Sequence, residues 1–199
     1  MSTVVVIDNG GGNVASVRYA LERLGATAEL SSDPERIRRA GRVILPGVGA
    51  AREAMARLET AGLTGVIAAL RQPVLGICLG MQLLFESSAE GDCDCLGILP
   101  GRAERLPGQS GRPVPHMGWN QLEILHPSPL LAGLADGEYA YFVHSYAVAV
   151  GPDTQAACRY GARFAAVAGR GNFHGVQFHP ERSAAAGARL LGNFLALER

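Results

Sequence analysis

The first 80 residues alternate between short apolar segments and longer segments with a helical repeat. Apolar runs that predict buried strands cover residues 4–7, 26–30, 43–45 and 74–77. Between the first two runs, Val14, Val17 and Leu21 recur at the spacing of one helix face. Repeated strand–helix units place the strands parallel to one another and cover both faces of the sheet with helices. The pattern therefore predicts an α/β fold, a three-layer αβα sandwich around a mostly parallel central sheet.

The pattern changes after about residue 97. Short strand-like pieces separated by Gly, Pro and Asp cover residues 119–124, 139–143, 146–150 and 164–168. They predict antiparallel additions to the central sheet, or beside it, in the C-terminal half. A last helix is predicted to carry Leu190, Leu191 and Phe194 inward. Because the sequence shows neither a repeat nor a linker, we expect one domain, 1–199.

Composition excludes several classes of protein. The 18 basic and 18 acidic residues balance, and no cluster of Lys and Arg marks a surface for nucleic acid. No apolar stretch approaches the length of a membrane span, so we expect a cytoplasmic protein without a membrane partner. The four cysteines are then expected to be reduced thiols. Cys93 and Cys95 lack a second cysteine pair or nearby histidines, so neither a metal site nor a cofactor is predicted.

Residues 75–81, Leu-Gly-Ile-Cys-Leu-Gly-Met, join a predicted strand to a predicted helix. Gly76 and Gly80 flank Cys78 in the Gly-x-Nuc-x-Gly pattern of a nucleophile elbow, a strained turn that presents the reactive atom. A Cβ at either glycine would collide with a backbone that doubles back. The start of the helix at Leu79 favours a thiolate and can point a free N–H at an oxyanion. The alternative is a small, inert cysteine buried at the end of a glycine-rich strand.

A cysteine nucleophile needs a base, and His179 stands out among the five histidines. It follows the strand-like residues 173–178, and Glu181 comes two residues later. The carboxylate can reach the ring nitrogen that faces away from the sulfur and stabilise the imidazolium. The alternative is a histidine at a strand end beside a surface glutamate. Cys78 and His179 can meet only if the fold unites them, as an α/β sheet does at the carboxyl ends of its strands.

A third segment, Pro-Gly-Val-Gly at residues 46–49, follows the strand predicted at 43–45. Its proline presets one turn angle, and Gly47 and Gly49 permit positive φ and a close approach to a ligand. Such a loop can aim a second backbone N–H at an oxyanion, beside that of Leu79. A plain strand-to-helix turn is the alternative.

Together, residues 46–49, 76–82 and 176–181 resemble, in order and approximate spacing, the class I (triad) glutamine amidotransferases. Three more segments, residues 7–13, 115–120 and 141–146, resemble the glutaminase subunits of imidazole glycerol phosphate synthase, and the resemblance covers essentially the whole chain. Asn9, Gly11 and Arg182 depart from the residues usual in those subunits. These departures concern only the expected contact with a partner.

The resemblance implies a glutaminase of histidine biosynthesis that acts on L-glutamine without a cofactor. Cys78 attacks the side-chain amide, His179 moves the proton to the leaving ammonia, and Glu181 orients His179. Ammonia passes to a cyclase subunit, which is a (β/α)8 barrel and makes imidazole glycerol phosphate and aminoimidazole carboxamide ribotide. The other implied residues are Val48 and Leu79 for the oxyanion, Gly47, Gly49, Gln82, Ser145 and Tyr146 for the substrate, and Asn13, Met117, Trp119 and Arg182 for the partner interface.

Three alternatives stay open at this point. A similar glutaminase could serve anthranilate, aminodeoxychorismate or pyridoxal phosphate synthase, although residues 117–120 and 141–146 argue against this. A non-catalytic binding module on the same fold would not need an intact Cys78, His179 and Glu181. A cysteine peptidase on a related fold is the third alternative. The glycines of residues 46–49 also suggest a switch, in which the oxyanion loop rests with a carbonyl inward and turns when the partner binds its ribonucleotide.

Overall fold

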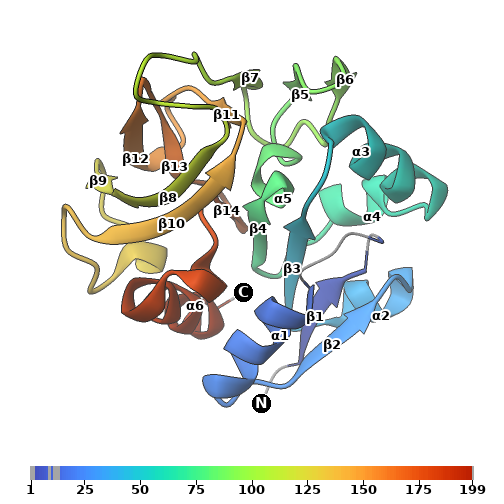
Figure 1. The fold of residues 1–199 in the computed structure, drawn as a ribbon. Coiled ribbons are helices and arrows are strands. Elements are labelled where there is room, and N and C mark those ends of the chain that lie inside the picture. The colour runs from blue at the N-terminus through green and yellow to red at the C-terminus, as the bar shows by residue number, and fades with distance from the viewer. Residues whose placement is uncertain (1–2, 9, 11–13, 199) are drawn as a thin grey trace.

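The computed structural model describes residues 3–8, 10 and 14–198. Asn9, Gly11 and Asn13, for which the sequence raised expectations, lie outside the described residues. The first part of the chain forms β1 (Val4–Ile7), α1 (Val14–Arg23), β2 (Ala28–Ser31), α2 (Pro34–Arg39), β3 (Arg42–Gly47), α3 (Ala51–Thr60), α4 (Thr64–Ala68), β4 (Val74–Cys78) and α5 (Leu79–Gln82) (Figure 1). The rest forms β5 (Ser87–Ser88), β6 (Cys93–Asp94), β7 (Arg102–Arg105), β8 (His116–Gln121), β9 (Glu123–Ile124), the 3-10 helix η1 (Pro129–Leu131), β10 (Tyr139–His144), β11 (Tyr146–Val148), β12 (Thr154–Tyr160), β13 (Ala162–Arg170), β14 (Phe173–Val176), the 3-10 helix η2 (Pro180–Arg182) and α6 (Ala184–Ala196).

Within the described residues, eight strands form the central sheet, in the order β2-β1-β3-β4-β14-β13-β12-β9. The strands from β2 to β14 in this order run parallel, and β13, β12 and β9 are antiparallel to their neighbours. The strand–helix repeats thus supply the parallel part, as predicted. β14 comes late in the chain but lies beside β4 in the middle of the sheet.

Alternate residues of β1 face opposite sides of the sheet. Val4 and Val6 belong to one buried apolar cluster, and Val5 and Ile7 belong to another. The first cluster packs under α1, α6 and the separate two-stranded sheet of β8 and β10. The second packs under α2 to α5 and a four-stranded sheet, β11-β7-β5-β6 (Figure 1). A strand buried on both faces has to be apolar throughout, which explains the continuous run of β1 and confirms the three-layer fold.

The strand predicted over residues 119–124 is two strands in different sheets. β8 pairs with β10, whereas β9 pairs with β12 at the edge of the central sheet. Leu122, between them, is buried, and its backbone donates to the Glu138 carbonyl and accepts from the Gly137 N–H. The chain crosses from one sheet to the other at this point. The sequence does not predict β12, because its alanines, Gln155 and Arg159 have weak strand propensity.

The strand order determines where the predicted functional segments meet. β3, β4 and β14 are neighbours in the sheet and run parallel. β3 ends at Gly47, β4 ends at Cys78, and His179 follows the end of β14. Because carboxyl ends of parallel strands lie at one edge, the three segments reach the same place.

Candidate active site

Cys78 lies at a sharp turn between β4 and α5. Its backbone adopts φ 55° and ψ −111°, a region that a residue with a side chain rarely occupies. The flanking glycines allow two backbones to approach closely. A Cβ on Gly76 would lie 2.6 Å from the Gly80 carbonyl oxygen, and one on Gly80 would lie 1.9 Å from the Leu45 carbonyl oxygen. The structure therefore has the strained strand-to-helix turn that the sequence predicts, although α5 is a single turn long.

Gly80→Ala should destabilise the protein strongly, because the new methyl group would meet the Leu45 backbone and not a movable side chain. We expect the free energy of unfolding to fall by about 3 kcal/mol in urea denaturation. Gly192→Ala is the matched control, since a Cβ at this position of α6 meets nothing within 4 Å and alanine favours a helix. Equal stability of the two variants would contradict the close approach at Gly80.

His179 is held by its backbone and by Glu181. Its N–H donates to the Tyr141 carbonyl of β10 at 2.9 Å, and its Nδ1 lies 2.9 Å from Oε1 of Glu181, whose side chain is fully buried. Burial lowers the pKa of His179, but interactions with Cys78 and Glu181 outweigh it and raise this pKa to about 10. An imidazolium between a cysteine and a carboxylate is placed to give its proton to a leaving group.

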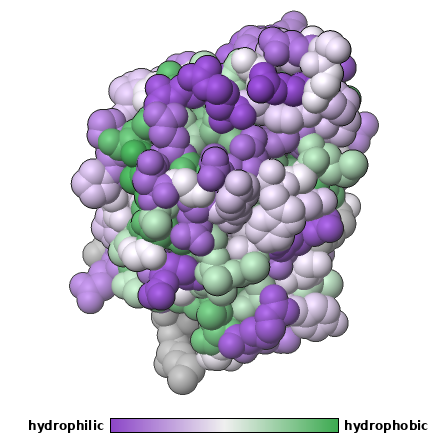
Figure 2. All heavy atoms as spheres, turned by 60° about the vertical axis from the view of Figure 1, so that its left-hand side comes forward, coloured by the Kyte–Doolittle hydropathy of each residue, from purple (hydrophilic) through white to green (hydrophobic). Residues whose placement is uncertain are grey.

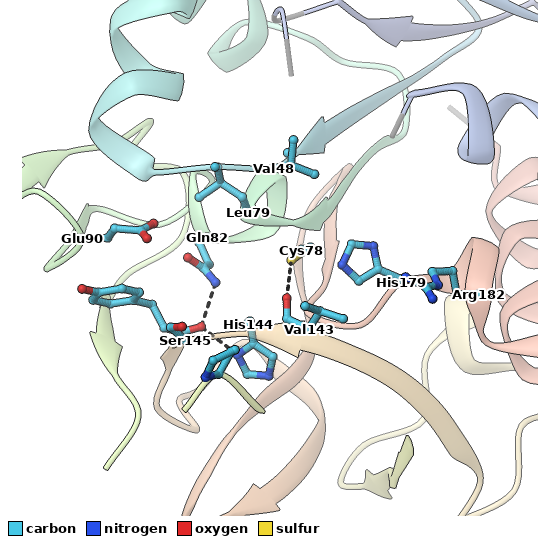
Figure 3. A pocket seen from close by; sticks show the side chains of 14 residues that line it. Val48, Cys78, Leu79, Gln82, Glu90, Val143, His144, Ser145, His179 and Arg182 are labelled. Atoms are coloured by element: carbon cyan, nitrogen blue, oxygen red, sulfur yellow. Dashed lines mark hydrogen bonds between the residues drawn. The ribbon is translucent and has the colours of Figure 1, made fainter. Parts of the chain in front are cut away.

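The Cys78 sulfur faces groups from the ends of two other strands, β10 and β14. Its thiol donates to the Val143 carbonyl at 3.6 Å, and Gln177 Nε2 donates to the sulfur at 3.8 Å. Figure 3 shows the His179 ring beside the Cys78 side chain. The fold thus brings Cys78, His179 and Glu181 together, although His179 follows Cys78 by 101 residues in the sequence.

A cavity of about 400 Å³ opens at Cys78 (Figure 3). Its walls include Gly47, Val48, Gly49, Cys78, Leu79, Gln82, Glu90, Pro115, Val143, His144, Ser145, Tyr146, His179 and Arg182. All residues that the sequence assigned to the oxyanion and the substrate are therefore in this wall. The Gln82 amide donates to the Tyr146 carbonyl at 2.8 Å and to Gln177 Oε1 at 3.0 Å. Because both amide hydrogens are used, Gln82 offers only its oxygen to a ligand.

Glu90 and Gln177 belong to the site, although the sequence does not single them out. Glu90 lies at the other end of the pocket from His179 (Figure 3). Its Oε2 accepts from the Ala51 N–H at 3.1 Å, and burial raises the pKa of its carboxyl. A half-buried carboxylate of this kind is a site for a positive charge. Glu90 stands in a Ser-Ser-Ala-Glu stretch without periodicity, so no sequence pattern could have found it.

Comparison with known proteins agrees with this geometry. Residues 5–197 match the family model described as glutamine amidotransferase class-I. The chain belongs to the class I glutamine amidotransferase family. It is 57% identical over 197 residues to the imidazole glycerol phosphate synthase subunit HisH of Xanthomonas euvesicatoria pv. vesicatoria, over 99% of this chain and 98% of the relative. It is 55% identical over 198 residues to the HisH subunit of Xylella fastidiosa, over 100% of this chain and 99% of the relative.

Two solved structures resemble the amidotransferase in fold. A protein of Thermoplasma acidophilum described as part of a GMP synthase superposes with a TM-score of 0.75 at 18% identity, over 98% of this chain and 92% of the other. A structure described as a glutamine amidotransferase gives a TM-score of 0.73 at 21% identity, over 96% of each chain. These likenesses concern the fold alone and confirm the predicted α/β class. The relatives confirm the predicted family, its imidazole glycerol phosphate synthase branch and the prediction of an enzyme.

The two glycines of the amidotransferase loop at residues 46–49 have different roles. A Cβ on Gly47 would lie 2.5 Å from the Gly80 nitrogen and 2.7 Å from Leu79 Cβ. Gly47 therefore allows β3 to pack against the turn at Cys78, and a larger residue would disturb the turn itself. Gly49 has φ +91°, and a Cβ added there would meet no atom within 4 Å. Of the two, Gly49 is the position where a substitution acts on the loop conformation alone.

An exposed apolar face lies beside the pocket. Met117 and Trp119 on β8 are 67% and 52% exposed. The Trp119 ring meets the Tyr141 ring edge-on at 5.8 Å, and the Arg182 guanidinium lies over the Tyr141 ring at 4.4 Å. On the β8–β10 side of the amidotransferase, Figure 2 shows apolar side chains reaching the surface in separate patches among polar ones. Met117, Trp119 and Arg182, predicted for the partner interface, thus gather on one face, while Asn13 lies outside the described residues.

The cysteines other than Cys78 have no visible role in the site. All four cysteines are free thiols. Burial raises the pKa of Cys95 and of Cys158 to about 12 in each case, so both are poor nucleophiles. In the part of the chain that the structure describes, no group of three His, Cys, Asp or Glu side chains could hold a metal ion. The same part contains no helix long and apolar enough to cross a membrane.

Proposed function

We propose that the chain is the glutaminase subunit of an imidazole glycerol phosphate synthase, with residues 1–199 as one cytoplasmic glutaminase domain. It hydrolyses L-glutamine to glutamate with Cys78, His179 and Glu181 and passes ammonia to a cyclase subunit. The observation that carries the proposal is the meeting of these three side chains at one end of the pocket, in a chain 57% identical to a HisH subunit.

Glutamine fits the pocket with its amide at Cys78 and its α-ammonium group at Glu90. Burial disfavours the charged form of the Glu90 carboxyl, and a bound ammonium group would restore it. The Gln82 oxygen lies in the wall between the two ends and can accept from the substrate. Ser145 and Tyr146 line the same wall.

Glu90→Gln should raise the KM for glutamine by about 10-fold or more and change kcat less. The variant loses the charged hydrogen bond between Glu90 and the substrate α-ammonium group, which binds glutamine but does not take part in the reaction of its amide. Steady-state release of glutamate by the complex measures both constants. Glu59→Gln is the control, since Glu59 is exposed near the end of α3, does not line the pocket and does not act on the Glu90 carboxyl. A large fall in kcat at an unchanged KM would contradict a binding role for Glu90.

The reaction proceeds in two halves. The Cys78 thiol gives its proton to His179, and the sulfur attacks the amide carbon. The N–H groups of Val48 and Leu79 hold the resulting oxyanion, each donor contributing about 3 kcal/mol. The C–N bond then breaks while His179 gives its proton to the departing nitrogen, which leaves a thioester and ammonia. Water loses a proton to His179 and attacks the thioester, which releases glutamate and the Cys78 sulfur. Glu181 keeps the ring oriented throughout.

The second subunit receives the ammonia. Free ammonia is protonated quickly in water, so transfer to an acceptor needs a sheltered path. We assign the face of Met117, Trp119 and Arg182 to a (β/α)8 cyclase subunit, because exposed Trp and Arg are frequent interface anchors. The cyclase would use the ammonia to build imidazole glycerol phosphate and release aminoimidazole carboxamide ribotide.

The decisive experiment measures glutamate release by the chain alone, with the purified cyclase subunit, and with cyclase plus its ribonucleotide substrate. We expect the last condition to exceed the first by about 10-fold or more, since the coupling free energy of two sites is commonly 1–3 kcal/mol. Stimulation by an anthranilate or aminodeoxychorismate synthase component in place of the cyclase would favour another acceptor. Hydrolysis of peptides without hydrolysis of glutamine would favour a peptidase.

Gly49→Ala should reduce this stimulation more than it changes glutamine binding. The methyl group meets no neighbour, but alanine resists positive φ by about 1–2 kcal/mol, which biases the oxyanion loop. We expect the stimulated rate to fall by about 10-fold and the KM to change by less than about 3-fold. Gly108→Ala, in open space without a positive φ, is the control. Unchanged stimulation in Gly49→Ala would argue against a rotating loop.

A further inference from the structure

Two buried histidines, His116 on β8 and His144 at the end of β10, take no part in the reaction proposed above. They are 2% and 6% exposed. Nδ1 of His116 lies 3.1 Å from Nε2 of His144, and Nδ1 of His144 lies 2.9 Å from the Tyr146 carbonyl oxygen. In such a chain each ring nitrogen is either a donor or an acceptor, so the partners decide where the hydrogens lie.

The partners of the two rings fix both tautomers. A carbonyl oxygen only accepts, so His144 carries its hydrogen on Nδ1 and accepts at Nε2. His116 therefore donates from Nδ1, and its Nε2 accepts from Asn120 Nδ2 at 3.3 Å. Asn120 gives its other amide hydrogen to the Arg159 carbonyl at 3.1 Å. All the ring hydrogen bonds thus point one way, from β8 towards the Tyr146 carbonyl.

Both rings are neutral in this environment. Burial lowers the pKa of His116 to about 4. Burial also lowers the pKa of His144 to about 3, against the opposing effect of its bond to Tyr146, while the neighbouring His116 and His179 lower it further. The Tyr160 ring stacks on His116 at 4.0 Å and shields it from water. A neutral imidazole supplies the one donor and one acceptor that each position requires.

The Tyr146 carbonyl also belongs to the glutamine site. It accepts from Gln82 Nε2 at 2.8 Å, and Figure 3 shows Gln82 and His144 reaching one oxygen from two sides. The Gln82 amide also donates to Gln177 Oε1, and Gln177 Nε2 donates to the Cys78 sulfur. A connected set of hydrogen bonds therefore leads from β8 to the nucleophile.

The two faces of β8 carry different groups. His116 and Asn120 point inward, while Met117 and Trp119 are exposed on the outer face. A movement of β8 cannot leave the inner hydrogen bonds unchanged, because buried donors and acceptors without partners are unfavourable.

We propose that His116 and His144 are positioning residues, which tie the Tyr146 carbonyl, and through it Gln82, to strand β8. As neutral Nδ1–H tautomers they make the glutamine pocket sensitive to the position of the strand that meets the partner subunit. The part that concerns the partner rests on the proposed function. The part that concerns the tautomers and the glutamine pocket stands on the structure of this chain.

The tautomers can be measured directly in the full-length chain. Nitrogen-15 NMR of histidine rings distinguishes Nδ1–H from Nε2–H forms and neutral from charged rings. We expect His116 and His144 to be neutral Nδ1–H tautomers between about pH 5.5 and 8, where an ordinary histidine titrates. An Nε2–H tautomer at either position, or titration of either ring in this range, would overturn the proposal. This measurement needs neither partner nor activity.

Two substitutions of His144 separate its two hydrogen bonds. The amide nitrogen of His144→Asn takes the place of ring Nδ1 and keeps a donor for the Tyr146 carbonyl, but it leaves His116 without an acceptor. His144→Gln places its amide near ring Nε2, so it keeps a partner for His116 and deprives the Tyr146 carbonyl of a donor. The proposal predicts that His144→Gln raises the KM for glutamine by about 10-fold. His144→Asn should keep the KM near the parent value and lose most of the stimulation by the cyclase partner.

Controls make this pair of variants decisive. His126→Asn removes an exposed histidine outside the set and should match the parent in every constant. Circular dichroism of each variant shows whether it is folded, and size-exclusion chromatography with the cyclase subunit shows whether it binds its partner. The positioning role is wrong if both His144 variants show the same rise in KM and the same loss of stimulation. It is also wrong if neither variant differs from His126→Asn. Failure of the parent chain to hydrolyse glutamine with the cyclase would instead reject the proposed function, and the NMR result would still decide the tautomers.

Discussion

Cys78→Ala is expected to abolish glutamine-dependent synthesis by the complex, while synthesis from added ammonium salts continues at the parent rate. The variant loses the only nucleophile that we place in the pocket, and removal of such a group lowers kcat by about 10³-fold or more. The ammonia-dependent rate should survive because the acceptor chemistry belongs to the partner subunit. Both rates can be followed in one assay of product formation, with glutamine or ammonium chloride as the nitrogen source.

The other cysteines supply the controls for this experiment. Cys158→Ala and Cys95→Ala should leave both rates within about 2-fold of the parent, because a thiol with a raised pKa is a poor nucleophile, and Cys158 is buried and Cys95 partly buried. Cys93→Ala should behave in the same way, since Cys93 does not line the pocket. Equal loss of the ammonia-dependent and glutamine-dependent rates in a folded Cys78→Ala complex would contradict the division of labour between the subunits.

The parallel half of the fold follows from sequence because each of its strands is buried on both faces. Val4 to Ile7 can be apolar throughout only if helices cover both sides. The antiparallel half is harder to predict from sequence. In a strand with one exposed face, the alternation of polar and apolar residues shows which side chains point inward, but it does not show which sheet the strand joins. At Leu122 the chain passes from β8, which pairs with β10, to β9, which pairs with β12, and this change of sheet therefore has no signature in the sequence.

The sequence predicts the parts of the site in which the chemistry requires an unusual backbone conformation. The glycines around Cys78 and the Pro-Gly-Val-Gly loop mark close approaches that the structure contains. Glu90 could not be found in this way, because a carboxylate that caps α3 and faces a pocket looks like any surface glutamate in a polar stretch. The pair of His116 and His144 is invisible for a related reason. Their contact joins two strands of a separate sheet, and only the register of β8 with β10 places them opposite one another.

His179→Ala should lower the glutamine-dependent rate of the complex nearly as far as Cys78→Ala, because no other base lies beside the sulfur among the pocket residues that the structure describes. Glu181→Gln should cost less, since an amide can still hold the ring in place. Glu181→Gln also removes a negative charge from the site. With Gln at position 181, the positive charge of His179 loses the carboxylate that helps to raise its pKa to about 10.

The pH dependence of Glu181→Gln tests this electrostatic role. The pKa of His179 lies above its ordinary value of 6.5 in the folded protein, so the charged form stabilises the fold below pH 6.5 and this stabilisation is lost as the pH rises towards 10. Activity that needs the imidazolium should decline over the same alkaline range. In Glu181→Gln the alkaline limb of glutaminase activity should move to lower pH, whereas Glu59→Gln, exposed on α3 and outside the pocket, should leave it in place. A limb that stays in place in Glu181→Gln, with only the rate reduced, would mean that the carboxylate orients the ring without tuning its charge.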